Sequence, residues 1–149
     1  IVLSPGPGTP KEAGICIDVV KELGDTIPVL GICLGHQAIG EAYGATVSHA
    51  EEVKHGKTAQ VSHHARTLFQ QLETEIEVMR YHSLVILEDT LPEELQITAR
   101  SLEDNEIMAV EHVSHPVYGV QFHPESIGTF DGKQILENFI ATIRERKVA

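Results

Sequence analysis

Basic residues, cysteines and long apolar runs are all scarce in this sequence. Its 149 residues include 11 lysines and arginines against 22 acidic residues, which gives a formal net charge of −11. Nucleic-acid phosphates require clustered basic side chains, so this balance argues against a nucleic-acid partner. The two cysteines, Cys16 and Cys33, are too few for a disulfide framework. No apolar run approaches the roughly 20 residues of a membrane-spanning helix, so we expect no membrane partner either.

The sequence also shows no initiating methionine and no signal peptide. Its length suits one domain with a substantial core, since 42% of the residues are hydrophobic. Without a signal peptide or a disulfide framework, the expected location is a reducing cytoplasm. Residues 1–3 have the composition of the middle of a buried strand, which is an unusual natural start. We therefore expect residues 1–149 to be one domain that lacks upstream elements.

The first 32 residues have the pattern of a βαβ unit. A strand ending at Leu3 precedes a loop over residues 4–10 that is too rich in proline and glycine for helix or strand. Apolar residues at helical spacing predict a helix over 11–23, with Cys16 in its buried stripe. Residues 26–32 predict a second strand, parallel to the first. Ligands bind at the carboxyl ends of such strands, where the loop and Cys33 both fall.

The chain changes character after a helix predicted over residues 35–43. Short β-prone stretches follow, and the turns between them predict antiparallel pairs along one side of the sheet. An amphipathic helix over 131–146 ends the chain. The expected fold class is α/β, with a mostly parallel central sheet, flanking helices and a small antiparallel portion. The β-prone stretches are 46–48, 58–62, 76–79, 85–87, 96–100, 107–112 and 117–122.

Cys33 stands where the buried strand turns into the next helix. Gly31 and Gly35 flank it two residues away on each side, as the close approach of strand and helix in a nucleophile elbow requires. The helix N-terminus would favour the thiolate, and the N–H of Leu34 would face an oxyanion formed on an attacked carbonyl. The alternative is a buried structural cysteine, because free cysteine is among the most buried residue types.

A second polar cluster follows the stretch at 117–122. His123 and Glu125 lie on either side of Pro124, which stops the strand, so both side chains can project from the sheet edge that carries Cys33. A thiol needs a base with a pKa near neutrality, and an imidazole needs a carboxylate to fix its tautomer. Cys33, His123 and Glu125 suit the roles of nucleophile, base and orienting acid. Taken alone, the His-Pro-Glu sequence would more often be an ordinary loop.

Nine histidines raise the question of a metal site. His63 and His64 would point to opposite faces of a strand, and His112 and His115 straddle a turn with no further ligands at metal spacing. We therefore expect solvent-exposed histidines, no metal site and no cofactor. The Pro/Gly loop over residues 4–10 has two explanations, since it can aim a glycine N–H at a ligand or serve as a plain tight turn.

Three motifs resemble those of the class I, or triad, glutamine amidotransferases. They are SPGPG at residues 4–8, GICLGHQ at 31–37 and QFHPES at 121–126, and the likeness spans essentially the whole chain. HGKT at 55–58 and RYHSL at 80–84 are similar to segments of the glutamine-hydrolysing subunit of anthranilate synthase or of aminodeoxychorismate synthase. The resemblance implies a flavodoxin-like fold with a further strand and helix before the Pro/Gly loop, which this chain lacks.

The resemblance also implies roles for individual residues. Cys33 would attack the side-chain amide of glutamine, His123 would pass the proton to the departing ammonia, and Glu125 would orient His123. A glutamyl thioester would form and then be hydrolysed. Backbone N–H groups of Leu34 and of the Pro/Gly loop would hold the oxyanion. The positions implied to bind glutamine are Gly6, Pro7, Gly8, Leu34, Gln37, Ser83 and Leu84.

Partners and alternatives follow from the same resemblance. The ammonia would pass to a synthase subunit that aminates chorismate, and residues 55–57 would lie near that subunit, although a surface turn explains them as well. His82 could be mistaken for a second base, but a wall of the glutamine pocket suits it better. Two other classes stay open. One is a non-catalytic scaffold subunit of the same fold, which would be expected to lose a triad residue, and the other is a thiol hydrolase for peptides or esters.

Overall fold

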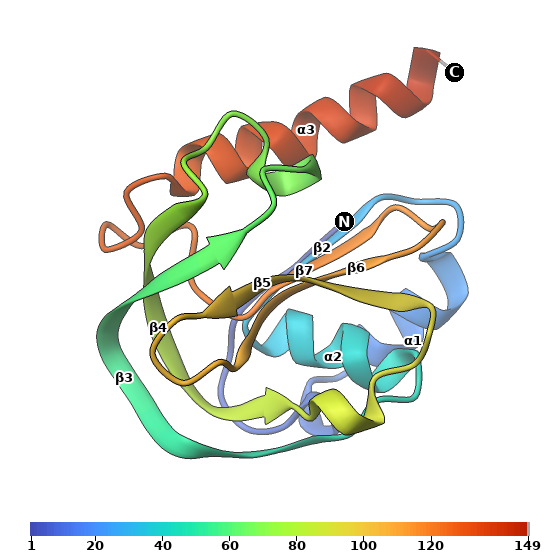
Figure 1. The fold of residues 1–149 in the computed structure, drawn as a ribbon. Coiled ribbons are helices and arrows are strands. Elements are labelled where there is room, and N and C mark those ends of the chain that lie inside the picture. The colour runs from blue at the N-terminus through green and yellow to red at the C-terminus, as the bar shows by residue number, and fades with distance from the viewer. Residues whose placement is uncertain (149) are drawn as a thin grey trace.

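The computed structural model describes residues 1–148, which form one seven-stranded sheet with helices on both faces (Figure 1). The strand order across the sheet is β1-β2-β7-β6-β5-β3-β4. The strands are β1 (Val2–Leu3), β2 (Val29–Ile32), β3 (Val47–His63), β4 (Glu75–Ile86), β5 (Leu95–Ser101), β6 (Ile107–His112) and β7 (Val117–Val120). The α-helices are α1 (Cys16–Leu23), α2 (Leu34–Ala42) and α3 (Gly132–Val148), and short 3-10 helices are η1 (Pro10–Glu12), η2 (Thr67–Phe69) and η3 (Glu88–Thr90).

The parallel part of the sheet consists of β1, β2 and β7. β2 pairs in parallel with β1 on one side and with β7 on the other, so that Leu30 stands opposite both Val2 and Tyr118. All four residues of β2 are buried, as the apolar run predicts for a strand covered on both faces. The predicted βαβ unit is therefore confirmed, and the segments that follow β1, β2 and β7 leave the sheet at one edge.

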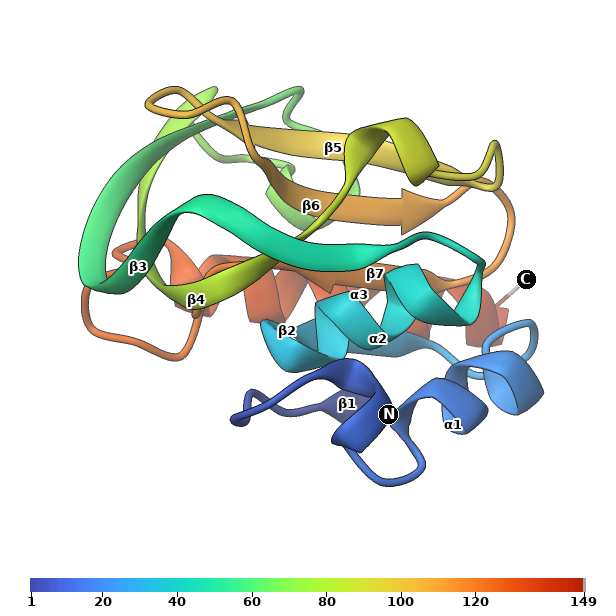
Figure 2. The ribbon, with the colours of Figure 1, turned by 90° about the horizontal axis from the view of Figure 1, so that it is seen from below.

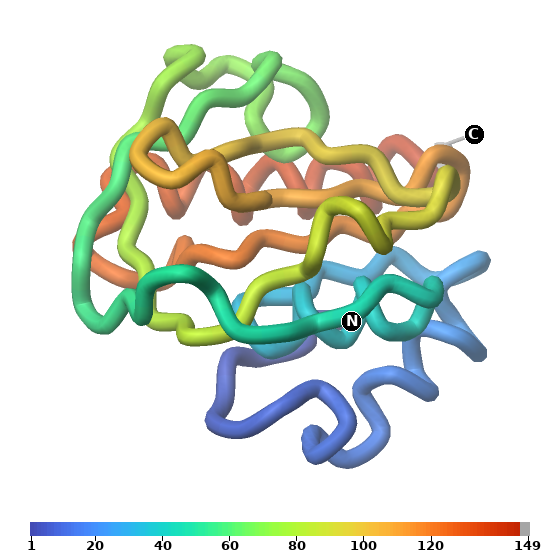
Figure 3. Tube along the Cα trace, turned by 60° about the horizontal axis from the view of Figure 1, so that its bottom comes forward, coloured from blue at the N-terminus to red at the C-terminus, as the bar shows by residue number. Residues whose placement is uncertain are grey.

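The antiparallel part is larger than the sequence indicated. β7 pairs antiparallel with β6, and the remaining pairs, β6 with β5, β5 with β3 and β3 with β4, are also antiparallel. The α/β class is confirmed, but the sheet is mixed and its parallel pairing is confined to three strands. Figure 3 shows the β3–β4 ribbon curling away from the rest of the sheet.

Two long strands replace four short predicted ones. The stretches at 46–48 and 58–62 belong to the single strand β3, and those at 76–79 and 85–87 belong to β4. The polar residues between the two stretches of β3 show no apolar alternation, because most of them are exposed to solvent. The sequence therefore gave no sign that the two stretches form one strand. Register shifts between His49 and Lys54 and between His55 and Lys57 mark where β3 bulges and bends against β4.

Helices cover the two faces of the sheet (Figures 1 and 2). α1 and α2 lie on one face, where Val20 and Ile39 pack into a core cluster, and α3 lies on the other, where Ile135 and Phe139 pack into a second cluster. The helix predicted over 11–23 is divided into η1 and α1 by Gly14, whose φ is 62°. None of the helices within residues 1–148 is both long and apolar enough to cross a lipid bilayer.

Candidate active site

Cys33 joins β2 to α2 in a strained backbone conformation. Its φ of 53° and ψ of −99° lie outside the regions that residues with a side chain usually adopt. A sharp strand-to-helix turn of this kind holds a nucleophile above the end of its strand. The nucleophile elbow predicted from the sequence is therefore present in the backbone.

The two flanking glycines are required by close backbone approaches. A Cβ on Gly31 would lie 2.5 Å from the carbonyl oxygen of Gly35, and a Cβ on Gly35 would lie 2.4 Å from the carbonyl oxygen of Leu3. Both distances are far shorter than any ordinary contact. The elbow thus also fixes the distance between α2 and the first strand of the sheet.

The Cys33 thiol is buried and protonated. It donates a hydrogen bond to the carbonyl oxygen of Tyr81, with 3.5 Å between the two atoms, and Nε2 of Gln121 donates to Sγ at 3.6 Å. Burial, together with the charge of Glu125, raises the thiol pKa to about 11, and the N–H of Leu34 opposes this shift. The helix N-terminus therefore favours the thiolate, as expected, but the loss of solvation outweighs this effect.

A polar cavity of about 200 Å³ opens beside Cys33. It brings together the Pro/Gly loop, the start of α2, the bulged part of β3 and the middle of β4. Every predicted glutamine-binding position except Leu34 lines it, and His82 forms part of its wall as expected. Leu34 instead starts α2 and packs its side chain toward Gly6. The lining residues are Gly6, Pro7, Gly8, Cys33, Gln37, Val53, Lys54, His55, Tyr81, His82, Ser83 and Leu84.

A pair of buried glutamine side chains ties this cavity to the thiol. Nε2 of Gln37 donates to the carbonyl oxygen of Leu84 at 3.1 Å and to Oε1 of Gln121 at 3.2 Å. Gln121 in turn donates to Sγ of Cys33. Both amide hydrogens of Gln37 are therefore engaged within the protein, and its Oε1 is the polar atom left for a ligand.

His123 and Glu125 form a close pair in the turn after β7. Nδ1 of His123 lies 2.6 Å from Oε1 of Glu125. The backbone of His123 is held on both sides, since its N–H donates to the carbonyl of Met79 and its carbonyl accepts from Oγ1 of Thr129. Its Nε2 is buried without a hydrogen-bond partner. With a proton on Nδ1 for Glu125, this Nε2 is a free acceptor for a proton.

Tyr81 contacts both halves of the predicted triad. Its carbonyl accepts from the thiol of Cys33, and its ring packs edge-on against the ring of His123, with 5.3 Å between the centroids. Among residues 1–148, no hydrogen bond joins Cys33 to His123 directly. The structure thus brings His123 and Glu125 together and sets Cys33 in the cavity, while the transfer of a proton from Cys33 to His123 stays a prediction.

Sequence reasoning missed several residues of this site. Tyr81 acts through its backbone carbonyl, which residue type cannot reveal, and Val53 and Lys54 reach the cavity only because β3 bulges. Lys54 is nevertheless buried, with Nζ 2.8 Å from Glu52 and 3.3 Å from Glu103. For Gln121 the one available indication was its place as the first residue of the QFHPES motif.

Some of the remaining histidines differ from expectation, while His49, His55 and His64 are exposed as predicted. His63 and His112 are buried, at 5% and 6% exposure, so the prediction of solvent-exposed histidines is wrong for them. His63 stacks on Phe69, and His112 stacks on His115, so aromatic packing explains their burial. Within the part of the chain that the structure describes, no group of three or more His, Cys, Asp or Glu side chains could hold a metal ion.

Comparison with known proteins agrees with this architecture. Over its full length the chain is 45% identical to the aminodeoxychorismate/anthranilate synthase component 2 of Bacillus subtilis, 76% of which it covers. It is 50% identical to part of the bifunctional protein TrpGD of Thermotoga maritima and spans only 26% of that longer protein. A solved structure from Thermoplasma acidophilum, named as a candidate GMP synthase subunit, superposes with a TM-score of 0.85 at 33% identity, over 99% of this chain and 75% of that one.

The family model for class-I glutamine amidotransferases matches residues 1–143. That match includes the elbow at Cys33, the cavity beside it and the turn that carries His123 and Glu125. The chain belongs to the class-I glutamine amidotransferases.

Proposed function

We propose that the chain hydrolyses glutamine to glutamate and ammonia with Cys33 as the nucleophile. The observation that carries this proposal is the elbow, which sets the thiol of Cys33 at a polar cavity lined by Gln37, Ser83 and Leu84. An amino acid is small enough for a cavity of about 200 Å³. Its charged end needs polar partners, and the backbone of Ser83 and Leu84 and Oε1 of Gln37 can supply them.

In the proposed first half-reaction, Sγ attacks Cδ of the glutamine side chain while the thiol proton passes to Nε2 of His123. The N–H of Leu34 and the loop around Gly6 and Gly8 stabilise the resulting oxyanion. The C–N bond then breaks as His123 gives its proton to the leaving nitrogen, which departs as ammonia. A γ-glutamyl thioester on Cys33 is left behind.

In the second half-reaction, His123 takes a proton from water and the hydroxide attacks the thioester carbonyl. Glutamate leaves as Sγ recovers its proton from His123. Glu125 keeps the proton of His123 on Nδ1 between these steps, which leaves Nε2 free to exchange protons. Because the thiol pKa is about 11, the base is essential: the neutral thiol must lose its proton during the attack.

The proposed recipient of the ammonia is a synthase subunit that aminates chorismate. The name of the Bacillus subtilis relative, an aminodeoxychorismate/anthranilate synthase component 2, supports a partnership of this kind. Anthranilate synthesis is the main proposal, and aminodeoxychorismate synthesis is the alternative with the same glutaminase chemistry. A cytoplasmic location belongs to the same proposal, since both cysteines are free thiols.

Replacement of the nucleophile tests this proposal. We expect Cys33→Ala to lower glutamine-dependent synthesis by the complex at least about a thousandfold, because no covalent intermediate can form. Synthesis from added ammonium salt should stay within about twofold of wild type, since the partner subunit carries that step. Steady-state assays of the complex with each nitrogen source provide the measurement.

Cys16→Ala is the matched control, because Cys16 packs on the core from α1 and does not line the cavity. It should leave both activities near the wild-type level. Loss of both activities in Cys33→Ala would contradict the division of labour between subunits. Unchanged glutamine-dependent synthesis would contradict the assignment of the nucleophile and favour a scaffold role.

A further inference from the structure

The part of β4 that lines the cavity is paired irregularly with β3, since a register shift interrupts the pairing at Ser83. His49 of β3 stands opposite Leu84, and the next paired residue, Lys54, stands opposite His82. Residues 50–53 therefore bulge opposite Ser83 alone. A backbone freed in this way can turn its polar groups toward a ligand, but it loses the ladder that would hold its geometry.

Side chains supply the missing restraint at the carbonyl of Leu84. Nδ1 of His82 lies 3.0 Å from this oxygen, and Nε2 of Gln37 donates to it at 3.1 Å. Both side chains are buried. The carbonyl thus accepts from two directions, and the backbone between His82 and Leu84 is fixed beside the cavity.

Arg80 determines which nitrogen of His82 carries the proton. Nε of Arg80 lies 3.0 Å from Nε2 of His82, and an arginine Nε–H can only donate. Nε2 of His82 must therefore accept, which places the proton on Nδ1, where it is donated to the carbonyl of Leu84. Burial, together with the charge of Arg80, lowers the pKa of His82 to about 4, so the ring stays neutral.

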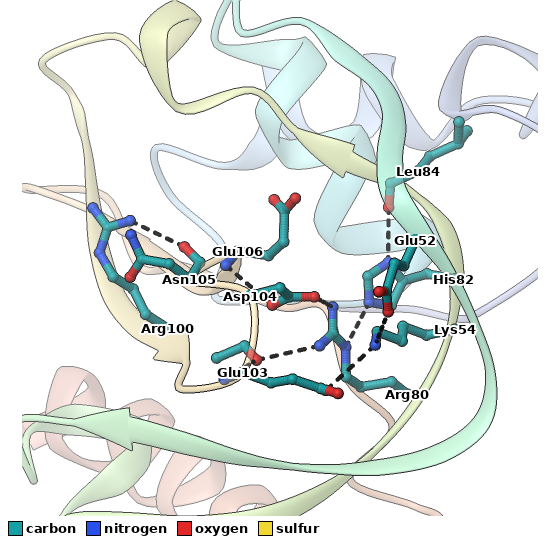
Figure 4. A network of polar contacts seen from close by, with 11 residues as sticks. Glu52, Lys54, Arg80, His82, Leu84, Arg100, Glu103, Asp104, Asn105 and Glu106 are labelled. Carbon is teal, nitrogen blue, oxygen red and sulfur yellow. Dashed lines mark hydrogen bonds and ion pairs between the residues drawn. The ribbon is translucent and has the colours of Figure 1, made fainter.

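Arg80 is itself held by the end of β5 and by the loop between β5 and β6. Its side chain is fully buried, with Nη1 donating to Oγ of Ser101 at 3.2 Å and Nη2 lying 2.9 Å from Oδ2 of Asp104. Burial alone would raise the pKa of Asp104, but hydrogen bonds from Arg80 and Ser101 outweigh it and the pKa is lowered. Figure 4 shows Arg80 between Asp104 and His82, with Leu84 beyond the imidazole.

We propose that Arg80 and His82 are positioning residues for glutamine, which act by holding the backbone at Ser83 and Leu84 in its binding conformation. This inference rests on the proposed glutaminase function and extends it to residues that need not touch the reacting atoms. A buried ion pair alone would be weak evidence of a role in stability or function. What points to positioning is the hydrogen-bond network in which Arg80, held by Asp104, donates to His82, and His82 donates to Leu84.

Two amide variants of His82, each of which matches one ring nitrogen, separate the two hydrogen bonds. In His82→Asn the amide nitrogen takes about the place of Nδ1 and can still donate to Leu84, whereas in His82→Gln the amide takes about the place of Nε2 and meets only Arg80. We expect His82→Gln to raise KM for glutamine about tenfold with kcat within about twofold, and His82→Asn to raise KM clearly less, because it keeps a donor to Leu84. Glutamate release by the full complex is the assay.

Arginine variants test the part of this hydrogen-bond network that lies beyond His82. Arg80→Met should raise KM for glutamine several-fold, because His82 is then free to move its proton to Nε2 and lose its donor to Leu84. Arg100→Met is the matched control, since Arg100 also pairs with a carboxylate, Glu88, and contacts the carbonyl of Asn105, but has no contact with His82. It should leave KM unchanged.

The tautomer can be read in the wild-type protein, independently of whether any variant folds. Two-dimensional ¹H–¹⁵N spectra of the histidine rings should show His82 with its proton on Nδ1. His63 and His112 should carry theirs on Nε2, because Nδ1 of each accepts from a backbone N–H.

A proton on Nε2 of His82 would overturn the inference, and so would equal KM values in His82→Gln and His82→Asn. A wild-type complex that releases no glutamate from glutamine would instead refute the proposed function, with the ring spectra still readable.

Discussion

The protonation of a single thiol governs how this site can work. Helix N-termini usually favour a thiolate, yet Cys33 is buried, and burial raises its pKa to about 11. The resting protein therefore holds a neutral thiol that donates to the carbonyl of Tyr81. Reactivity must come from a base that acts during the attack, and the unpartnered Nε2 of His123 is the group with that capacity.

Labelling should distinguish the two cysteines. We expect a chloroketone analogue of glutamine to alkylate Cys33 and spare Cys16, because only Cys33 lines the cavity that would bind the amino-acid end. The rate should increase as the pH rises from about 6 to about 9, because the thiol must lose its proton to react and its pKa of about 11 lies well above this range. Mass spectrometry of peptides from the labelled protein gives the site.

Excess glutamine should protect Cys33 from this reagent, and Cys33→Ala should prevent labelling at the cavity. Labelling of Cys16 ahead of Cys33 would mean that the elbow does not carry the reactive thiol. A rate that is independent of pH across the same range would contradict the raised pKa.

At the scale of elements, the strand–turn–helix from β2 to α2 is set by sterics. Gly35 lies in the first turn of α2, where helix propensity alone favours alanine over glycine by roughly 1 kcal/mol. The carbonyl of Leu3 in β1 occupies the space of a Cβ, however, at 2.4 Å. The tertiary contact therefore opposes the local preference.

Gly35→Ala should destabilise the protein by about 1–3 kcal/mol, because β1 or α2 must shift to relieve an overlap with backbone atoms. Urea denaturation gives the free energy of unfolding. Glu41→Ala, on the same helix, is the matched control and should change stability by less than about 0.5 kcal/mol. A Gly35→Ala protein that is more stable than wild type would show that helix propensity outweighs the steric overlap. It would contradict the close packing of α2 on β1.

The whole molecule encloses uncharged histidines between α2 and the sheet. His36 is completely buried, and neither of its ring nitrogens has a hydrogen-bond partner. Burial lowers the pKa of His36 to about 3 and that of His82 to about 4, against about 6.5 in an unfolded chain. The native fold therefore excludes protons that the unfolded chain would bind.

Stability should consequently fall as the pH drops from about 6.5 toward 4. In this range the unfolded chain takes up a proton on His36 and on His82, whereas the native protein does not. Each of the two can therefore lower the free energy of unfolding by up to about 1.4 kcal/mol per pH unit. Free energies of unfolding from urea titrations at about pH 7 and about pH 5 give the slope. His36→Gln should flatten it, whereas the exposed His64→Gln should not. A slope in His36→Gln equal to that of wild type would refute this account.

The sequence by itself determined the features that depend on local sterics and spacing. The βαβ start, the glycines around Cys33, the strand end before His123 and the C-terminal helix could all be predicted, because neighbouring residues decide them. The lining of the cavity by Gly6, Gln37 and Ser83 followed from motifs whose order along the chain matches a known family. The lengths of β3 and β4 could not be predicted, since their middle parts carry polar residues without apolar alternation, exposed in most of β3 and buried at Arg80 and His82 in β4.

Only the tertiary structure decided the electrostatics of the site. The raised pKa of Cys33, the carbonyl of Tyr81 that accepts from it and the tautomer of His82 all depend on burial and on groups from distant segments. The sequence shows that residue 80 is an arginine and residue 104 an aspartate. It does not show that Arg80 and Asp104 form an ion pair next to a residue of the cavity wall. Charge, solvation and hydrogen bonding act through space, and folding alone sets those distances.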